Sequence, residues 1–330
     1  MSPNPNPNPD ILVSVIIPVK NGAATIRLCL EALVRQTIAA RMEIILIDSG
    51  SKDDTNRIAA DFPVKMLTIE PGTFNHGLTR NLGVTEAKGE FLYFTVQDAR
   101  LAAEDALQHM LDHFKDKEVM GVCGTQAVPP GETDKNPVLW YHPFSAPGSH
   151  RYQFPDASVY RNLPAERRLE LSRWDNVNAM YRRSALQALP FIAADFAEDM
   201  FWARSALEKG WAIVSDTGII AWHYHHRDFS YAFREAFILH YAIYRYFDIL
   251  PAYPPVARRL KVIGAILWRE RSVGYRAKFY WLFHNLGDLL GSWLATKRFR
   301  SAARGRDENK IRQAYLRYCS QVPQGRVKGQ

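Results

Sequence analysis

Cysteine is scarce in this sequence. The chain has 330 residues but only three cysteines, Cys29, Cys123 and Cys319. They are far apart and lack the spacing of metal ligands. This pattern indicates free thiols in a reducing compartment.

Long apolar segments are also missing. No window contains about 18 uninterrupted apolar residues, so we expect no membrane-spanning helix. The first nine residues are a Pro/Asn repeat without the basic and apolar regions of a signal peptide. We therefore expect residues 1–10 to be a disordered tail and the protein to be cytoplasmic.

The charged residues are unevenly distributed. The formal net charge is +8, and basic residues concentrate after Arg258, where they are mixed with aromatic residues. We expect residues 11–245 to form one domain and residues 246–330 a basic-aromatic helical extension. Two interpretations of the extension stay open. Its helices could lie on an anionic membrane face, or they could pack as a cap on the rest of the chain.

Strands and helices alternate in the first part of the chain. Residues 12–19, 43–48 and 64–69 are apolar, β-branched runs that are typical of buried strands. Segments with helical spacing of apolar residues separate them, at 24–36 and 53–61. This order predicts an α/β fold, Rossmann-like, with a mostly parallel sheet flanked by helices.

The middle of the chain lacks the regular alternation of strands and helices. Residues 129–172 are polar and proline-rich, and are too long for an ordinary connection. We expect an irregular loop there. Residues 174–181 are predicted to form a short strand, and so are residues 211–214 and 218–222.

Polar side chains follow two of the predicted strands. Gln97 and Asp98 come after the apolar run 89–96, and Asp48 ends the run 43–48. Ligands of open α/β sheets bind beyond the carboxyl ends of the strands. Asp98 could ligate a divalent cation that holds a diphosphate, or simply cap the next helix. Asp48 could accept hydrogen bonds from a base or ribose, or satisfy the amides of its own turn.

Other polar residues suggest a site, and each also has a simpler explanation. Arg80 lies one turn into a predicted helix, which suits an anion site or an ion pair. Glu198 and Asp199 open another predicted helix, where acids also complement the helix dipole. His223 and His225 follow a predicted strand and could bind a metal or only form hydrogen bonds.

The order of these motifs resembles one known family. The motifs are the first predicted strand with Lys20-Asn21, the run 47–55 (IDSGSKDDT), Gln97-Asp98 and Glu198-Asp199. Together they resemble the family 2 glycosyltransferases, which have the GT-A fold. Within that family, residues 74–81 (FNHGLTRN) and 96–99 (VQDA) are similar to the bacterial rhamnosyltransferase branch. The resemblance covers about residues 11–245.

This resemblance implies an activity, its partners and the residues that serve it. A sugar, rhamnose in that branch, would pass with inversion from a deoxythymidine- or uridine-diphosphate sugar to a glycan or lipid-linked glycan. The enzyme would use Mn²⁺ or Mg²⁺, bind no nucleic acid, and could contact the inner face of the membrane through the extension. By resemblance, the donor would be bound by Pro18, Lys20, Asp48, Ser49, Arg80 and Gln97, the acceptor by Trp174, Asn176 and Asn178, and the metal by Asp98, His223 and His225.

The resemblance also assigns the catalytic carboxylates, with one departure from the family pattern. Asp199 matches the family's general base, and Glu198 stands beside it. Val96 replaces the first acid of the family's metal motif, which leaves Asp98 as the main carboxylate ligand. Two other functions stay open: a sugar nucleotidyltransferase, for which residues 20–22 are too sparse in glycine and basic residues, and a non-catalytic nucleotide-sugar-binding protein.

Overall fold

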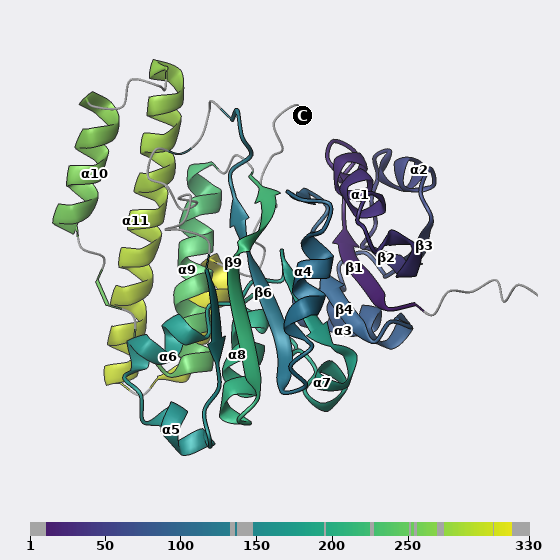
Figure 1. The fold of residues 1–330 in the computed structure, drawn as a ribbon. Helices are drawn as coiled ribbons and strands as arrows, with labels where there is room; N and C mark the ends of the chain where they lie inside the picture. The colour runs from purple at the N-terminus through teal and green to yellow at the C-terminus, as the bar shows by residue number, and fades with distance from the viewer. Residues whose placement is uncertain are drawn as a thin grey trace, which may run out of the picture. The chain divides into compact units, whose positions relative to one another are not determined.

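The chain divides into two units in the computed structural model (Figure 1). Residues Met1–Ala127 and Pro143–Tyr224 make up the sheet unit, and residues Val128–His142 and His225–Gln330 make up the helical unit. The residues that the structure describes are 11–132, 136, 148–194, 196–224, 228–250, 252–253, 256–268, 274–305 and 307–318.

A nine-stranded sheet forms the centre of the sheet unit. Its order is β3-β2-β1-β4-β8-β6-β9-β5, and β7 pairs with β9. The strands are β1 (Val13–Val19), β2 (Met42–Asp48), β3 (Val64–Thr68), β4 (Phe91–Phe94), β5 (Ala99–Leu101), β6 (Val119–Ala127), β7 (Ser149–Tyr152), β8 (Ala179–Arg182) and β9 (Ala212–His223). The first four strands are parallel, as predicted. Antiparallel β8, between β4 and β6, makes the whole sheet mixed.

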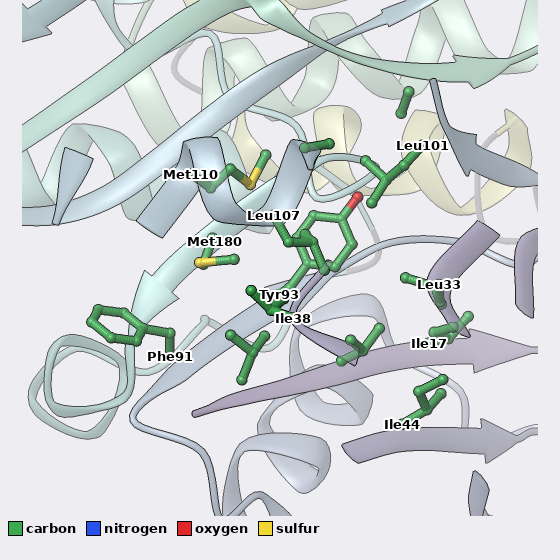
Figure 2. Packing of buried hydrophobic residues seen from close by; sticks show 14 of the residues in the cluster. Ile17, Leu33, Ile38, Ile44, Phe91, Tyr93, Leu101, Leu107, Met110 and Met180 are labelled. Atoms are coloured by element: carbon green, nitrogen blue, oxygen red, sulfur yellow. The ribbon is translucent and has the colours of Figure 1, made fainter. Parts of the chain in front are cut away.

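Helices cover both faces of this sheet. They are α1 (Ile26–Val34), α2 (Thr55–Ala59), α3 (His76–Glu86), α4 (Ala106–His113), α5 (Ala157–Arg161), α6 (Ala165–Leu171), α7 (Arg183–Ala188) and α8 (Glu198–Glu208). Successive side chains of a strand point to opposite faces. Ile17 of β1 therefore packs in the cluster that α1 and α4 contribute to (Figure 2). Val15 belongs to the same cluster, whereas Ile16 belongs to the cluster that α7 and α8 contribute to. Both faces are apolar, which explains why residues 15–19 of β1 are all apolar.

Three predictions of local structure need correction. The expected irregular loop 129–172 contains β7, α5 and α6 within its described part. The strand expected at 174–181 begins only at Ala179, because Asp175 accepts a hydrogen bond from the Val177 amide and forms a turn. The two strands expected at 211–222 are one strand, β9, and its pairing with β6 is interrupted by a shift in register.

The described helical unit contains α9 (Phe229–Phe247), α10 (Val256–Trp268), α11 (Tyr275–Arg304) and α12 (Glu308–Tyr318). Glycines let α11 approach α9 closely. A Cβ atom on Gly287 would lie 2.5 Å from the carbonyl oxygen of Phe229, and one on Gly291 would lie 2.3 Å from that of Phe233. The predicted domain boundary at residue 246 would separate most of α9 from α11, against which it packs. The structure places α9 and α11 in one unit.

A helix that spans a membrane has to be both long and apolar. Within the residues that the structure describes, no helix has both properties.

The close approach of α9 and α11 gives a first prediction. Replacing Gly291 with Ala should destabilise the helical unit by about 1–3 kcal/mol, because the methyl group has to displace the backbone of α9. Gly264 on α10 is the matched control, since a Cβ atom there meets nothing closer than 3.8 Å. Gly264→Ala should be neutral or stabilising, as expected for a helix interior. Urea unfolding monitored by circular dichroism measures both, and equal effects of the two changes would contradict this account.

Candidate active site

Two loops at the carboxyl ends of β1 and β2 are bound to each other. The amide of Asn21 donates to Ser51 Oγ at 2.9 Å, and the amide of Gly22 donates to Thr55 Oγ1 at 2.7 Å. In return, Asn21 Oδ1 accepts a hydrogen bond of 2.8 Å from the Lys52 amide. These bonds fix the position of Lys20 and of the turn that follows Asp48.

Asp48 at the end of β2 is buried, and its carboxylate stabilises the turn that follows it. Its Oδ1 accepts hydrogen bonds from the Ser51 amide (2.9 Å) and hydroxyl (2.6 Å), and its Oδ2 accepts one from Asn56 (3.1 Å). Burial raises the pKa of Asp48, but these hydrogen bonds outweigh it and hold the pKa below its ordinary value. The structure therefore shows the turn-stabilising role, and contact with a base or ribose stays a prediction. Ser49 is also buried, and its hydroxyl donates to the carbonyl oxygen of Val19 at 3.2 Å.

Gln97 connects β4 to β1. Its Oε1 accepts from the Lys20 amide at 2.8 Å, and its Nε2 donates to the Lys20 carbonyl oxygen at 3.0 Å. The side-chain amide of Gln97 thus continues the sheet where the strands themselves separate. The pairing of β1 with β4 ends at Ile16 and Phe94, so Pro18 needs no amide hydrogen on that side.

Asp98 and His223 lie together where β5 begins and β9 ends. His223 Nε2 is 3.3 Å from Asp98 Oδ1, and the imidazole is almost completely buried. A carboxylate and an imidazole are ligands that Mn²⁺ accepts, so the donor set fits a divalent metal. His225 lies outside the described residues. Among the described residues, no group of three His, Cys, Asp or Glu side chains is arranged to hold a metal.

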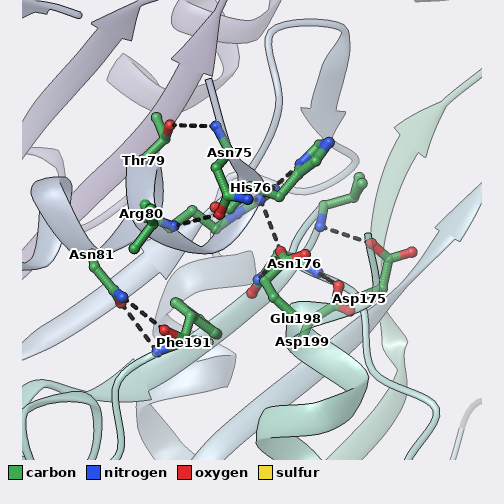
Figure 3. Close-up of polar contacts among 12 residues, drawn as sticks. Asn75, His76, Thr79, Arg80, Asn81, Asp175, Asn176, Phe191, Glu198 and Asp199 are labelled. Carbon is green, nitrogen blue, oxygen red and sulfur yellow. Dashed lines mark hydrogen bonds and ion pairs between the residues drawn. The ribbon is translucent and has the colours of Figure 1, made fainter. Parts of the chain in front are cut away.

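Arg80 of α3 forms a buried ion pair with Glu198 of α8 (Figure 3). Arg80 Nη1 is 2.9 Å from Glu198 Oε1, and the two side chains are 5% and 4% exposed. Burial raises the pKa of Glu198, but the Arg80 guanidinium, His76 and the hydrogen bond from Asn176 together outweigh it and hold the pKa below its ordinary value. The guanidinium also contacts His76 Nδ1 at 3.1 Å. The expected contact of Arg80 with a diphosphate stays a prediction, because the partner observed is Glu198.

The segment before α8 is attached to α3, which brings the two charges together. Asn81 Nδ2 donates to the carbonyl oxygen of Phe191 at 2.8 Å, and Asn81 Oδ1 accepts from the Phe191 amide at 3.1 Å (Figure 3). A Cβ atom on Gly77 would lie 1.8 Å from the carbonyl oxygen of Ile192, so only glycine permits this approach. The FNHGLTRN motif therefore has a structural role as well as its match to the family.

Asp199 follows Glu198 in the first turn of α8. Its two oxygens accept hydrogen bonds from the amides of Asn176 (3.0 Å) and Met200 (2.7 Å). Burial raises the pKa of Asp199 well above its ordinary value, and the neighbouring carboxylates of Glu198 and Asp175 raise it further. The residue is half-buried, so part of it remains accessible. An accessible carboxylate with a raised pKa has the properties of a general base.

The three expected acceptor residues, Trp174, Asn176 and Asn178, are buried, and their polar groups bind inside the protein. Trp174 Nε1 donates to the Tyr181 hydroxyl at 2.7 Å, which donates in turn to Asn176 Oδ1 at 2.6 Å. Asn176 Nδ2 continues this chain to Glu198 Oε1 at 3.0 Å. Asn178 accepts from the Tyr93 hydroxyl at 3.0 Å and donates to two backbone carbonyls. Acceptor contact stays a prediction for these residues, and the observed bonds support the carboxylates instead.

Sequence reasoning missed two residues of this region, Asp175 and Gln126. Gln126 Oε1 lies 2.6 Å from His223 Nδ1, and Gln126 Nε2 donates to Asp175 Oδ2. Burial raises the pKa of Asp175, although the Val177 amide and His223 oppose the shift. For Asp175 the sequence offered one signal, which is a charged side chain within residues 174–181, a segment predicted to form a short strand.

Comparisons with known proteins show what the chain is similar to. The model of the family described as "Glycosyl transferase family 2" matches residues 14–189. The O-antigen chain rhamnosyltransferase RfbN of Salmonella typhimurium is 31% identical over 242 residues, which are 72% of this chain and 70% of that protein. The O-antigen chain rhamnosyltransferase WbaN of Salmonella anatum is 32% identical over 177 residues, which are 52% of this chain and 53% of that protein.

Two solved structures share the fold at low sequence identity. S. aureus TarS in complex with UDP-GlcNAc has a TM-score of 0.51 and 16% identity, and covers 88% of this chain and 92% of its own. The mannosyltransferase PcManGT of Pyrobaculum calidifontis, in complex with GDP-Man and Mn²⁺, has a TM-score of 0.52 and 18% identity, and covers 96% of this chain and 82% of its own. The predicted GT-A fold with C-terminal helices is thereby confirmed.

The buried ion pair gives a second prediction. Glu198→Gln leaves the Arg80 charge buried without a counter-charge, which should cost about 3–5 kcal/mol of stability at neutral pH. The pKa of Glu198 is lower in the folded protein than in the unfolded chain. The stability that its charge provides is therefore fully present above the ordinary glutamate pKa and is lost as pH falls through the lowered value. The variant and the parent should therefore converge in acid.

The exposed pair of Arg57 with Asp54, 2.9 Å apart, is the control for this change. Asp54→Asn should leave the unfolding midpoint essentially unchanged, since exposed ion pairs contribute little. Urea unfolding at neutral and acidic pH measures both variants. The ion-pair account is wrong if Glu198→Gln unfolds at the same urea concentration as Asp54→Asn at neutral pH.

Proposed function

This chain belongs to glycosyltransferase family 2, and we propose that it transfers rhamnose, with inversion, from a nucleoside-diphosphate sugar to a glycan or lipid-linked glycan. Two relatives named as O-antigen chain rhamnosyltransferases support the sugar and the glycan acceptor. The TarS complex contains UDP-GlcNAc and the PcManGT complex contains GDP-Man, which supports a nucleotide-sugar donor. One observation carries the mechanism: the half-buried Asp199 carboxylate, with a raised pKa, beside the Arg80–Glu198 pair.

The donor is proposed to bind at the two connected loops that follow β1 and β2. Pro18, Lys20, Asp48 and Ser49 are the residues assigned to the base and ribose. The hydrogen bonds of Gln97 support a role in holding the Lys20 backbone. We assign Arg80 to positioning Glu198 rather than to direct diphosphate contact, because its guanidinium is buried against that carboxylate.

A divalent cation, Mn²⁺ or Mg²⁺, is proposed to be held by Asp98 and His223, with His225 as a further candidate ligand. When bound, such a cation neutralises negative charge on a departing diphosphate. The short distance between Asp98 and His223 supports this assignment, and so does the Mn²⁺ that accompanies GDP-Man in the PcManGT complex.

Asp199 is proposed to accept the proton of the acceptor hydroxyl as that oxygen attacks the anomeric carbon. A general base works best when its pKa approaches the working pH, and the carboxylates of Glu198 and Asp175 shift the pKa of Asp199 in that direction. The amides of Asn176 and Met200 hold both of its oxygens in place. The inverting reaction requires no covalent intermediate, so no nucleophilic serine or cysteine is needed.

The alternative of a sugar nucleotidyltransferase has less support. Such an enzyme would hold phosphates with free backbone amides in the loop after the first strand. Here the amides of Asn21 and Gly22 already donate to Ser51 and Thr55. This loop therefore offers few donors to a phosphate.

We also propose that the helical unit contacts the inner face of the membrane, where a lipid-linked acceptor would lie. Five large side chains on one face of α11 are 41–82% exposed: Tyr275, Phe279, Phe283, Leu290 and Trp293. At 100° per residue they fall within about 80° of the helix circumference. The opposite face of α11 is buried and includes polar side chains such as Asn285 and Asp288, so the large apolar side chains of the exposed face are not needed to pack α11.

The charge of this part of the chain is complementary to anionic lipid. Residues 246–330 contain 17 Lys and Arg but only five Asp and Glu. Basic and aromatic side chains are also adjacent in the structure. Lys297 Nζ lies 5.0 Å from the centre of the Trp293 ring. This combination is typical of helices that lie on a membrane surface, and it favours a membrane contact over a cap.

The proposed base gives a third prediction. Asp199→Asn should keep the fold and the affinity for the donor but slow transfer by about two to four orders of magnitude. Glu198→Gln should slow transfer less, because Glu198 acts through Asp199. Release of nucleoside diphosphate from deoxythymidine- and uridine-diphosphate sugars measures transfer, and calorimetry measures donor binding.

Asp105→Asn, at the exposed start of α4, is the control and should leave turnover unchanged. Activity of Asp199→Asn within a few-fold of the parent, together with an inactive Glu198→Gln, would make Glu198 the base. If both variants remain active, this cluster is not the catalytic centre.

The α11 face gives a fourth prediction. The full chain should float with anionic liposomes at low salt and less at high salt, since each basic residue near the surface contributes about 1 kcal/mol. Phe279→Ser combined with Phe283→Ser should weaken flotation about tenfold or more, because each buried phenylalanine contributes on the order of 1.5–3 kcal/mol. Leu28→Ser, at an exposed leucine of the sheet unit, should have no effect. Absence of flotation at low salt would leave α11 as an internal cap or as a contact between copies.

A further inference from the structure

The register of three strands brings Asp98, His223 and Gln126 together. Residue Ala99, directly after Asp98, pairs with His223 in the antiparallel ladder of β5 and β9. On the other side of β9, Gln126 of β6 pairs with Ala221, which shares a sheet face with His223. The imidazole therefore lies between a carboxylate and a side-chain amide. Its Nε2 is 3.3 Å from Asp98 Oδ1, and its Nδ1 is 2.6 Å from Gln126 Oε1.

The hydrogen-bonding partners of Gln126 determine which imidazole nitrogen carries hydrogen. The NH₂ group of Gln126 donates to Asp175 Oδ2, an oxygen that acts here as an acceptor. The carbonyl oxygen of the same amide then faces His223, and it can only accept as well. His223 Nδ1 must therefore be the donor. In the neutral ring, this leaves the lone pair on Nε2, the nitrogen that faces Asp98.

We propose that Gln126 and Asp175 are positioning residues that fix the tautomer of His223, so that Nε2 and Asp98 can share a divalent cation. The inference rests on the metal assignment of the proposed function. A histidine ligand commonly donates its second N–H to a fixed acceptor, and the loss of that acceptor weakens metal binding by about 10–100-fold. Gln126 has no other role in the proposed reaction, whereas the charge of Asp175 also acts on Asp199.

A competing arrangement uses the same contacts without a metal. If the imidazole were protonated, Nε2 would donate to Asp98 and the two would form an ordinary ion pair. Gln126 and Asp175 would then stabilise the fold alone. If Gln126 and Asp175 position a metal ligand, replacing them weakens the binding of Mn²⁺. If their role is only structural, replacing them leaves the affinity for Mn²⁺ unchanged.

The experiment is calorimetric titration of the full chain with Mn²⁺, in the presence of UDP or dTDP. The parent should bind Mn²⁺, and Asp98→Ala should abolish the response. Gln126→Met keeps the side-chain length but removes the acceptor, and should bind Mn²⁺ about 10–100-fold more weakly with a similar unfolding midpoint. Gln108→Met, on the exposed surface of α4, is the matched control and should bind as the parent does.

An exchange variant tests the direction of the hydrogen bonds. Asp175→Asn alone allows the Gln126 amide to rotate and offer NH₂ to His223, so it should weaken Mn²⁺ binding. Gln126→Glu combined with Asp175→Asn places a carboxylate against His223 and an amide behind it, and should restore affinity to within a few-fold. This pair of variants also decides the question if Gln126→Met does not fold.

The outcomes separate this inference from the metal assignment itself. If the parent binds Mn²⁺, Asp98→Ala does not, and the Gln126 and Asp175 variants bind as tightly as the parent, the positioning role is wrong and the metal site stands. If the parent shows no Mn²⁺ response, or Asp98→Ala leaves it unchanged, the metal assignment fails and the inference fails with it.

Discussion

Arg80 and Glu198 carry opposite charges into a region of the sheet unit that water hardly reaches. Each charge is tolerated there only because the other is present. This requirement holds α3 against the start of α8 and fixes the carboxylate that neighbours Asp199. Because Arg80 keeps Glu198 ionised, a negative charge remains beside Asp199 and contributes to its raised pKa. The ion pair thus connects the stability of the fold to the basicity of the proposed catalytic residue.

Asp175 connects the two parts of the candidate site. On one side it binds Gln126, which faces His223 and the proposed metal ligands. On the other side its charge raises the pKa of Asp199. A single carboxylate therefore influences both the group proposed to hold the metal and the group proposed to accept the proton. Sugar transfer as proposed needs both functions, and Asp175 is the residue through which they influence each other.

Much of this could be predicted from the sequence, because the signals are local. The first strands are mostly apolar, and polar residues follow the carboxyl ends of several of them. The partners of the polar residues could not be predicted, since they depend on the fold: Arg80 meets a residue 118 positions away. β5 is too short for a periodic pattern, and its place is set by pairing with β9. The close packing at the glycines of α11 could not be predicted either, because these glycines contact the backbone of another helix.

The most direct test of the central claim is the pH dependence of kcat/KM for the parent and for Glu198→Gln. If Asp199 is a base whose pKa is raised by burial and by neighbouring carboxylates, activity should rise with pH through an inflection above the ordinary aspartate value of about 3.9. Removal of the Glu198 charge should move that inflection to lower pH. An inflection at the ordinary value, or one that does not move in Glu198→Gln, would contradict the account.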